Sequence, residues 1–126
     1  MNSVQGDELI IEKISDYIIN KYNLKVSIET KKPLRELFPK PENKWLSTIW
    51  SHGHADISVY RHGELKCIIE PGGSAHLREA RQISADKRKD RLCKLNGVNV
   101  LRLMNSVINC LDHPKTKRLF RKYIYS

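Results

Sequence analysis

Two acidic residues, Asp56 and Glu70, stand in neighbouring segments of this sequence and have the type and spacing to do chemistry together. The segments 55–60 and 65–70 are rich in β-branched residues and flank a short turn, so they predict a β-hairpin. A three-residue loop, His62 to Glu64, places Asp56 directly opposite Glu70, with Cβ atoms about 4.5–5.5 Å apart. A two-residue loop shifts the pairing by one residue and separates the two acids onto different faces.

Burial favours the register in which the two carboxylates are opposed. That register gathers the apolar side chains on one face, namely Ala55, Ile57, Val59, Cys67 and Ile69. It leaves Asp56, Ser58, Lys66 and Glu70 on the other face. Adjacent carboxylates repel unless a positive charge neutralises them, and Mg²⁺ or Mn²⁺ takes hard oxygen ligands of this kind. We therefore expect a divalent-cation site, and the alternative is a solvated strand face on which the acids pair with Lys or Arg.

The segment after Glu70 adds further candidates. Pro71-Gly72-Gly73-Ser74 ends the strand, and a basic helix is expected over residues 75–95. His76 lies at the start of that helix, and its imidazole has an unperturbed pKa of about 6.5, which suits a general acid or base. Some of the helix's Lys and Arg side chains are expected to contact phosphates.

The charge of the chain is unevenly distributed. Lys and Arg number 23 and Asp and Glu number 14, so the formal net charge is +9. Residues 77–126 hold 13 basic and 4 acidic side chains, and this difference accounts for the whole +9. Such asymmetry favours a polyanionic partner, most often nucleic acid, and the alternative is an ordinary soluble basic protein.

Cysteine usage and hydropathy indicate a cytoplasmic protein. Cys67, Cys93 and Cys110 lie far apart, with no C-x-x-C pair, so we expect a reducing, intracellular setting and no disulfide framework. No uncharged run approaches the roughly 18–20 residues of a membrane span, and residues 1–8 lack the features of a signal peptide. We therefore expect no membrane association.

The periodicity of the sequence predicts one α/β domain over residues 1–126. The expected elements are a helix over 7–21, a strand over 24–29, a loop over 30–43, a strand or turn over 44–50, the hairpin, the basic helix, a strand over 98–103, and a basic helical tail over 106–126 broken near Pro114. This α-β-β-β-α-β-α order is typical of a central mixed β-sheet flanked by helices.

The order and spacing of several motifs resemble those of the PD-(D/E)xK nuclease superfamily. The motifs are Gly53-x-x-Asp56, Ile68-Ile69-Glu70-x-x-Gly73-x-x-His76, Asp86-x-x-Lys89-Asp90-x-Leu92 and Gly97-Val98-x-Val100-Leu101-Arg102. Within the superfamily the sequence is most similar to the branch of the very-short-patch-repair-like endonucleases, which share an E-D-x-H-D pattern. The resemblance covers about residues 53–103 and implies a restriction-endonuclease-like core.

The resemblance also implies a function and roles for individual residues. It implies a small Mg²⁺-dependent endonuclease that hydrolyses DNA, with Mn²⁺ as a substitute metal, in DNA repair or in a mobile element. Asp56 and Glu70 would hold the metal, and His76 would transfer a proton. Asp86 on the long helix would complete the motif together with Glu8 on the first helix, or with Glu12 in its place. The residues expected to contact DNA are Lys87, Lys89, Arg91, Arg102, Lys115, Lys117 and Arg118.

One departure from the family pattern leaves an alternative open. The superfamily's third motif residue, usually Lys or Asp, is here Gly72, which has no side chain. Either His76 and residues of the helix replace it, or the chain is a degenerate nuclease fold that serves as a nucleic-acid-binding module or as a subunit of a larger complex. Duplex or structured DNA is the expected partner, with a homodimer or a partner protein as a further possibility.

A different metal site is also conceivable from the spacing alone. In the pattern His52-x-His54-x-Asp56, an extended strand would point all three side chains the same way. Two imidazoles and a carboxylate suit Zn²⁺ or Mn²⁺.

Overall fold

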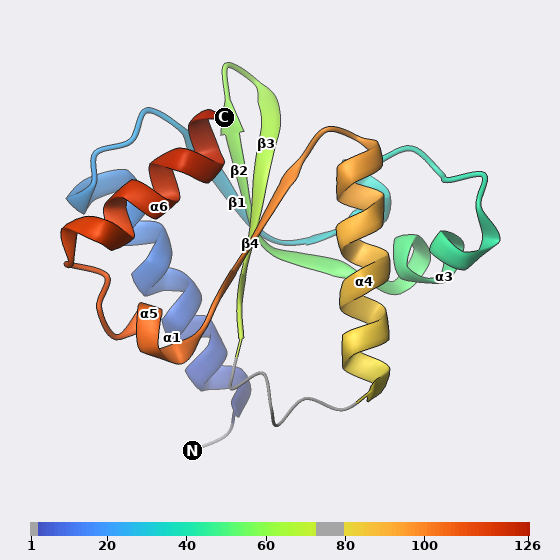
Figure 1. The fold of residues 1–126 in the computed structure, drawn as a ribbon, viewed down its shortest axis with the longest axis horizontal. Helices are drawn as coiled ribbons and strands as arrows, with labels where there is room; N and C mark the ends of the chain where they lie inside the picture. The colour runs from blue at the N-terminus through green and yellow to red at the C-terminus, as the bar shows by residue number, and fades with distance from the viewer. Residues whose placement is uncertain (1–2, 73–79) are drawn as a thin grey trace.

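Helices and strands alternate along the chain, and the computed structural model describes residues 3–72 and 80–126 (Figure 1). In chain order the elements are α1 (Ser3–Asp16), the π-helical turn η1 (Tyr17–Lys21), β1 (Ser27–Pro33), α2 (Leu34–Leu37), α3 (Lys44–His52), β2 (His54–Arg61), β3 (Glu64–Pro71), α4 (Ala80–Leu95), β4 (Asn99–Leu103), α5 (Asn105–Ile108) and α6 (Pro114–Tyr125). The expected α/β class and the order of its main elements are confirmed.

The four strands form one mixed sheet in the order β1-β2-β3-β4. The first three strands pair antiparallel, and β4 pairs parallel to β3 after the chain crosses one face of the sheet through α4. Figure 1 shows α1, α5 and α6 on one side of the sheet and α3 and α4 on the other. Because helices cover both faces, the central strands β2 and β3 carry consecutive buried residues rather than a strict alternation.

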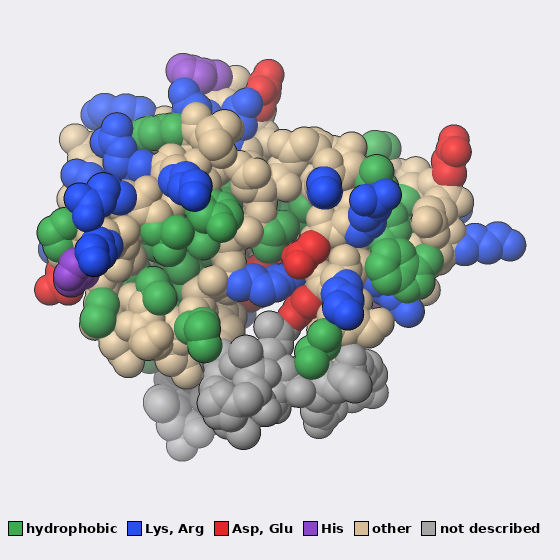
Figure 2. All heavy atoms as spheres, in the orientation of Figure 1, with side chains coloured by type: hydrophobic (Ala, Val, Ile, Leu, Met, Phe, Trp, Pro, Cys, Tyr) green, Lys and Arg blue, Asp and Glu red, His purple; other side chains and the backbone are tan. Residues whose placement is uncertain are grey.

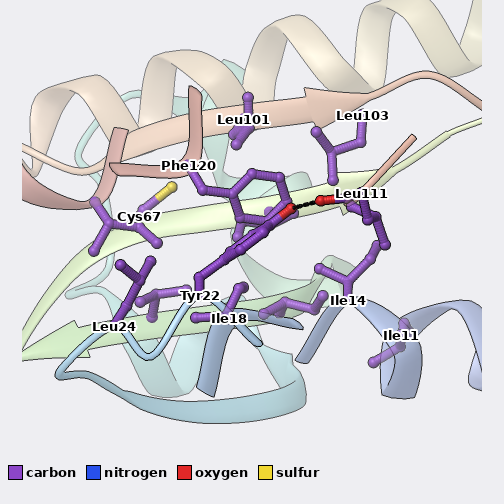
Figure 3. Packing of buried hydrophobic residues seen from close by; sticks show 14 of the residues in the cluster. Ile11, Ile14, Ile18, Tyr22, Leu24, Cys67, Leu101, Leu103, Leu111 and Phe120 are labelled. Carbon is purple, nitrogen blue, oxygen red and sulfur yellow. Dashed lines mark hydrogen bonds between the residues drawn. The ribbon is translucent and has the colours of Figure 1, made fainter. Parts of the chain in front are cut away.

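The larger core lies between the sheet and the helices α1 and α6 (Figure 3). Ile18 after α1 and Phe120 and Ile124 of α6 are fully buried there. Tyr22 packs against Phe120 with ring centroids 5.3 Å apart, and its hydroxyl donates a hydrogen bond to the carbonyl of Leu111 at 2.5 Å. The basic C-terminal segment is therefore a packed layer of the fold and not an appended tail.

The smaller core lies on the opposite face of the sheet, under α2 and α4. From α4 it receives Leu92 and Cys93, which are buried. Two other apolar residues of this helix are exposed, Ile83 by 41% and Leu95 by 59%. The long basic helix thus contacts the sheet near its C-terminal half and presents apolar side chains to solvent elsewhere.

The first helix and first strand differ from expectation in their details. On α1 the apolar side chain of Leu9 is 57% exposed, whereas Ile11 is buried. Ile11, Ile14 and Ile18 follow the i, i+3, i+7 spacing of one helical face. Strand β1 begins three residues later than expected and continues through Lys31, a residue with a positive φ of 53°.

Residues 44–50, expected as a strand or turn, lie within the helix α3. The Asn43 side chain accepts a hydrogen bond from the backbone N–H of Trp45 at 2.7 Å, which is a helix N-cap. His52 is the last residue of this helix, so the extended geometry assumed for His52, His54 and Asp56 is wrong.

The β2–β3 hairpin has the expected register but not the expected loop. The turn contains two residues, His62 and Gly63, both with positive φ (53° and 79°), as in a type I′ turn. The pairing then shifts between Tyr60↔Leu65 and Val59↔Cys67, because Lys66 is an extra residue in β3. This bulge offsets the shorter loop and restores the pairing of Ile57 with Ile69 that the opposed carboxylates require.

All three cysteines are free, as expected. Cys67 and Cys93 are buried and Cys110 is exposed. Burial raises the pKa of both buried thiols to about 12. Among the helices that the structure describes, none has the length and apolar character needed to cross a membrane.

Candidate functional site

Asp56 and Glu70 meet at one end of the sheet, where β2 begins and β3 ends, through the backbone of Asp56 and the carboxylate of Glu70. The backbone N–H of Asp56 donates a hydrogen bond to Oε2 of Glu70 at 2.9 Å. Ser58 and Ile68, which flank them toward the turn, are Cα partners and both fully buried. The prediction that Asp56 and Glu70 are neighbours across the hairpin is therefore confirmed.

The face that carries Glu70 is covered by α4 and is not a solvated strand face. Glu70 is 8% exposed, and its Oε1 forms an ion pair with Nζ of Lys89 from α4. The same ammonium donates a hydrogen bond to the carbonyl of His54 at 2.7 Å. A carboxylate at the end of β3 is thus neutralised by an amine of the helix, and both of its oxygens accept hydrogen bonds.

Lys89 was expected to contact DNA phosphates, but the structure directs its amine into the protein. Its side chain is 14% exposed, and the side chain of Glu70 is 11% exposed. Gly72, which stands at the third motif position, donates its backbone N–H to the carbonyl of Leu103 at 2.8 Å and has no side chain. The cation nearest to Glu70 in this site therefore comes from the helix and not from the strand.

A second ionic cluster lies next to this pair, between β4 and α4. Arg102 is the Cα partner of Glu70 across the parallel strands. Its Nη2 donates a hydrogen bond to Oδ1 of Asp90 at 2.6 Å and lies 3.6 Å from Oδ1 of Asp86. Arg102, expected to bind DNA, and Asp86, expected in the catalytic set, are thus held together beside the carboxylate pair.

Glu8 approaches the same end of the sheet from the other side. It forms an ion pair of 3.1 Å with Lys31 of β1. In the β1–β2 register Lys31 stands between the partners of Ile57 and Ala55, which is the position across from Asp56. Glu8 lines a pocket of about 400 Å³ with Glu12 and Lys31. Of the two glutamates proposed for the first helix, Glu8 is the one with the ion pair to the sheet.

Two histidine hypotheses have different outcomes. His76, expected as the proton-transfer residue, lies outside the described residues. His52 and His54 belong to a helix end and to the first residue of β2, so they do not form the extended ligand set proposed for Zn²⁺. Within residues 3–72 and 80–126, no three or more His, Cys, Asp or Glu side chains gather in an arrangement that could hold a metal ion.

The remaining residues expected to bind DNA divide between two surfaces. Lys87 and Arg91 are exposed on α4, the helix that also carries Lys89. Lys115, Lys117 and Arg118 belong to α6, which packs on the opposite face of the sheet. Figure 2 shows basic side chains gathered over α6 and a separate basic group over α3 and α4.

The C-terminal end of α6 lies near the turn end of the hairpin. The guanidinium of Arg61, at the turn end of β2, lies 4.5 Å from the centroid of the Tyr125 ring at the end of α6. Arg61 lies five positions after Asp56 along β2, a span of about 17 Å at about 3.4 Å per residue. The C-terminal end of α6 is therefore remote from Glu70, and α6 as a whole packs on the face of the sheet opposite to α4.

The sequence patterns missed two features of the site. The ion pair between Lys89 and Glu70 joins residues 19 positions apart, and only the packing of α4 on the sheet brings them together. The second feature is an exposed tryptophan, Trp45, beside Arg88 of α4, whose guanidinium carbon lies 5.6 Å from the Trp45 ring centroid. The Asn43 cap was a usable sequence signal for α3, the helix that positions Trp45.

Comparison of the chain with protein-family models, with curated proteins and with solved structures gave no match in any of the three. The chemistry of the site therefore follows from its own residues. They provide two carboxylates at adjacent strand ends, an ammonium directed at one of them, an acidic and basic cluster alongside, and a surface with a large excess of cations.

Proposed function

We propose that the chain is a small metal-dependent endonuclease that hydrolyses DNA phosphodiester bonds, with a restriction-endonuclease-like core. The single observation that carries the proposal is the constellation of Asp56, Glu70 and Lys89 at one end of the sheet. Two acidic residues at neighbouring strand ends and a lysine, here supplied by the helix α4, are the residue types of the PD-(D/E)xK pattern. The element order and the net charge of +9 support the same function.

The donor set is one that Mg²⁺ accepts. Mg²⁺ keeps several waters and is usually bound by one or two carboxylates together with substrate phosphates, so a third protein carboxylate is not required. Asp56 and Glu70 would hold the ion, with Glu70 fixed in place by its hydrogen bond from the Asp56 N–H. When bound, the metal polarises a phosphoryl oxygen and lowers the pKa of a bound water.

Lys89 supplies the positive charge that Gly72 cannot. In this proposal its ammonium holds the Glu70 carboxylate in position and, once a phosphate is bound, stabilises the negative charge that develops in the transition state. Arg102 fixes Asp86 and Asp90 next to this group. Lys87 and Arg91 on the outer side of α4 attract the DNA backbone without reading its sequence.

A second candidate function is a nucleic-acid-binding module with a degenerate site. One observation favours it: both oxygens of Glu70 already accept hydrogen bonds from within the protein, from Lys89 and from the Asp56 N–H. A carboxylate that already accepts hydrogen bonds from the protein binds a metal ion less favourably than an unpaired carboxylate does. The two candidates differ in cleavage and share DNA binding.

A cleavage assay on labelled DNA with Mg²⁺, with Mn²⁺ and with EDTA tests the proposal. The substrates are intact duplex, nicked, mismatched, branched and single-stranded DNA of one sequence. We expect metal-dependent cleavage that falls at least about 100-fold in Asp56→Asn and in Lys89→Met, with DNA affinity in EDTA within about twofold of wild type. Lys87→Met is the matched control, because it removes a neighbouring exposed lysine and is expected to keep the cleavage rate.

The outcomes separate the two candidates. DNA binding by wild type without cleavage of any substrate would favour the binding module. Cleavage that persists unchanged in Asp56→Asn would refute the role of Asp56, and equal effects of Lys87→Met and Lys89→Met would refute the special role of Lys89.

A further inference from the structure

Trp45 of α3 is an exposed aromatic residue, whereas the other tryptophan of this helix packs against the core. Trp50 donates its indole N–H to the carbonyl of Phe38 at 2.9 Å and packs against the smaller core. Trp45, five residues earlier in α3, leaves 45% of its surface exposed. Large aromatic side chains contribute most when buried, so an exposed indole at a fixed position indicates a contact surface.

The position of the Trp45 ring is fixed by its neighbours. Its backbone N–H is held by the Asn43 cap at the start of α3. The guanidinium of Arg88 from α4 lies over the ring, 5.6 Å from the centroid, a cation–π distance. The Nε atom of Arg88 is buried, and it has no hydrogen-bond partner within the part of the chain that the structure describes.

The surroundings of the indole are cationic. Lys44 on α3 and Lys87 and Arg91 on α4 are exposed, and within residues 3–72 and 80–126 none of them forms an ion pair with an acid. The acids of α4, Asp86 and Asp90, each lie two positions from Arg88, about 200° around the helix, and pair with Arg102. The side of α4 that faces Trp45 therefore carries positive charge that the acids of α4 do not neutralise.

We propose that Trp45, together with Arg88 and the flanking cations, forms a stacking site for an unpaired nucleobase, which makes DNA with a locally unpaired or single-stranded base the preferred substrate. An aromatic ring in a positive groove stacks any base, because every base has a π-face, while Lys and Arg contact the phosphates on either side. In an intact duplex the base faces are occupied by their neighbours. This inference rests on the proposed function, because it specifies the nucleic acid that the chain acts on.

The location of the stacking site agrees with this role. Arg88 and Lys89 are consecutive residues of α4, so one helix holds both the cation on the Trp45 ring and the cation on Glu70. In this proposal a strand whose unpaired base stacks on Trp45 lies along the helix that also contacts Glu70. The basic residues of α6 lie on the other face of the sheet and are not part of this site.

Fluorescence anisotropy in EDTA tests the inference without cleavage. The probes are a perfect duplex, the same duplex with one unpaired base, and the single strand. We expect wild type to bind the last two about tenfold more tightly than the duplex, which corresponds to about 1.4 kcal/mol. Trp45→Ala should lose this preference and change duplex affinity less than about twofold, and Trp45→Phe should keep part of it.

Leu95→Ala is the control, because Leu95 is an exposed apolar residue at the end of α4, the helix that carries Arg88, and is 59% exposed. It should retain the full preference. Equal affinity of wild type for all three probes, or a preference that survives Trp45→Ala, would overturn the stacking site and leave the nuclease proposal standing. Loss of cleavage in Asp56→Asn with the preference intact would support both proposals, and absence of binding to every probe would overturn both.

Discussion

The ion pair between Lys89 and Glu70 gives the most direct test of how the site is built. Its side chains are 14% and 11% exposed, so both charges have lost most of their solvent. Lys89→Met keeps the length of the side chain and removes the charge. The Glu70 carboxylate then keeps the Asp56 N–H as its hydrogen-bond donor and has no counter-ion from the helix. Breaking a buried pair in this way costs about 3–5 kcal/mol.

Urea unfolding at pH 7 measures the effect. For a domain of this size the free energy of unfolding falls by about 2 kcal/mol per molar urea. A variant that loses about 3 kcal/mol of this free energy should therefore unfold at a midpoint about 1.5 M lower in urea. Lys87→Met, which removes an exposed neighbour on α4, should change the free energy of unfolding by no more than about 0.5 kcal/mol.

A double-mutant cycle identifies the partner. Gln at position 70 still accepts a hydrogen bond from the Asp56 N–H and carries no charge, so Glu70→Gln in the Lys89→Met background removes the unpaired carboxylate. We expect the double variant to be more stable than Lys89→Met alone, with a coupling energy of about 1–3 kcal/mol. Additive effects of the two substitutions, or a Lys89→Met variant as stable as Lys87→Met, would refute the argument that α4 neutralises Glu70.

Three further predictions concern the cysteines, the tyrosines and the cap. In the folded protein Cys110 alone should react rapidly with a thiol reagent, and all three thiols should react in denaturant; fast reaction of Cys67 or Cys93 would contradict their burial. Burial raises the pKa of Tyr22 from 10 to about 12, and the thiols of Cys67 and Cys93 from 9 to about 12. The folded state therefore favours the protonated forms of these three groups. Their contribution to the urea midpoint of unfolding should be constant below pH 9, and the midpoint should fall between pH 9 and 12. The fall should be less steep in Tyr22→Phe. Asn43→Ala should cost about 1 kcal/mol of unfolding free energy, measured in urea, because it removes the cap of α3, and Asn43→Asp should restore it.

The sequence predicted the central elements well because their signals are local or depend on burial. The strands around Asp56 and Glu70 follow from β-branched residues, and the end of α4 follows from Asn96-Gly97, where Gly97 has a positive φ of 70°. The helix α3 was missed because Trp, Ile and Thr have weak helix propensity, and its stability depends on the Asn43 cap and on packing against α4.

The parts of the site that the sequence did not predict depend on tertiary packing. Lys89 belongs to the motif Asp86-x-x-Lys89-Asp90-x-Leu92, but both Lys89 and Lys87 were expected to contact phosphate. The difference arises because α4 crosses the sheet with Leu92 and Cys93 against the smaller core, and the residue one turn before Cys93 is Lys89. The direction of a long basic side chain on a helix is therefore set by which neighbouring residues are buried.

The hairpin shows why its register could be predicted although its loop could not. Loop length depends on the positive φ values of His62 and Gly63, whereas the register depends on the burial of Ile57 and Ile69. Burying such side chains stabilises the fold by about 1.5–3 kcal/mol each, more than one bulge residue costs, so burial decides the pairing. The bulge at Lys66 compensates for the loop being one residue shorter than expected.

Because burial sets the register, deletions and insertions in β3 should have different effects. Removing Lys66 leaves Tyr60 opposite Leu65 and Val59 opposite Cys67, so the strands pair without a bulge and Asp56 stays next to Glu70. The deletion should lower the free energy of unfolding by less than about 1 kcal/mol. One Ala inserted between Ile68 and Ile69 should instead prevent folding, because it turns Ile69 and Glu70 to the opposite faces. Urea unfolding compares the two variants, and a deletion as damaging as the insertion would mean that the bulge itself, and not the burial of the strand faces, sets the register.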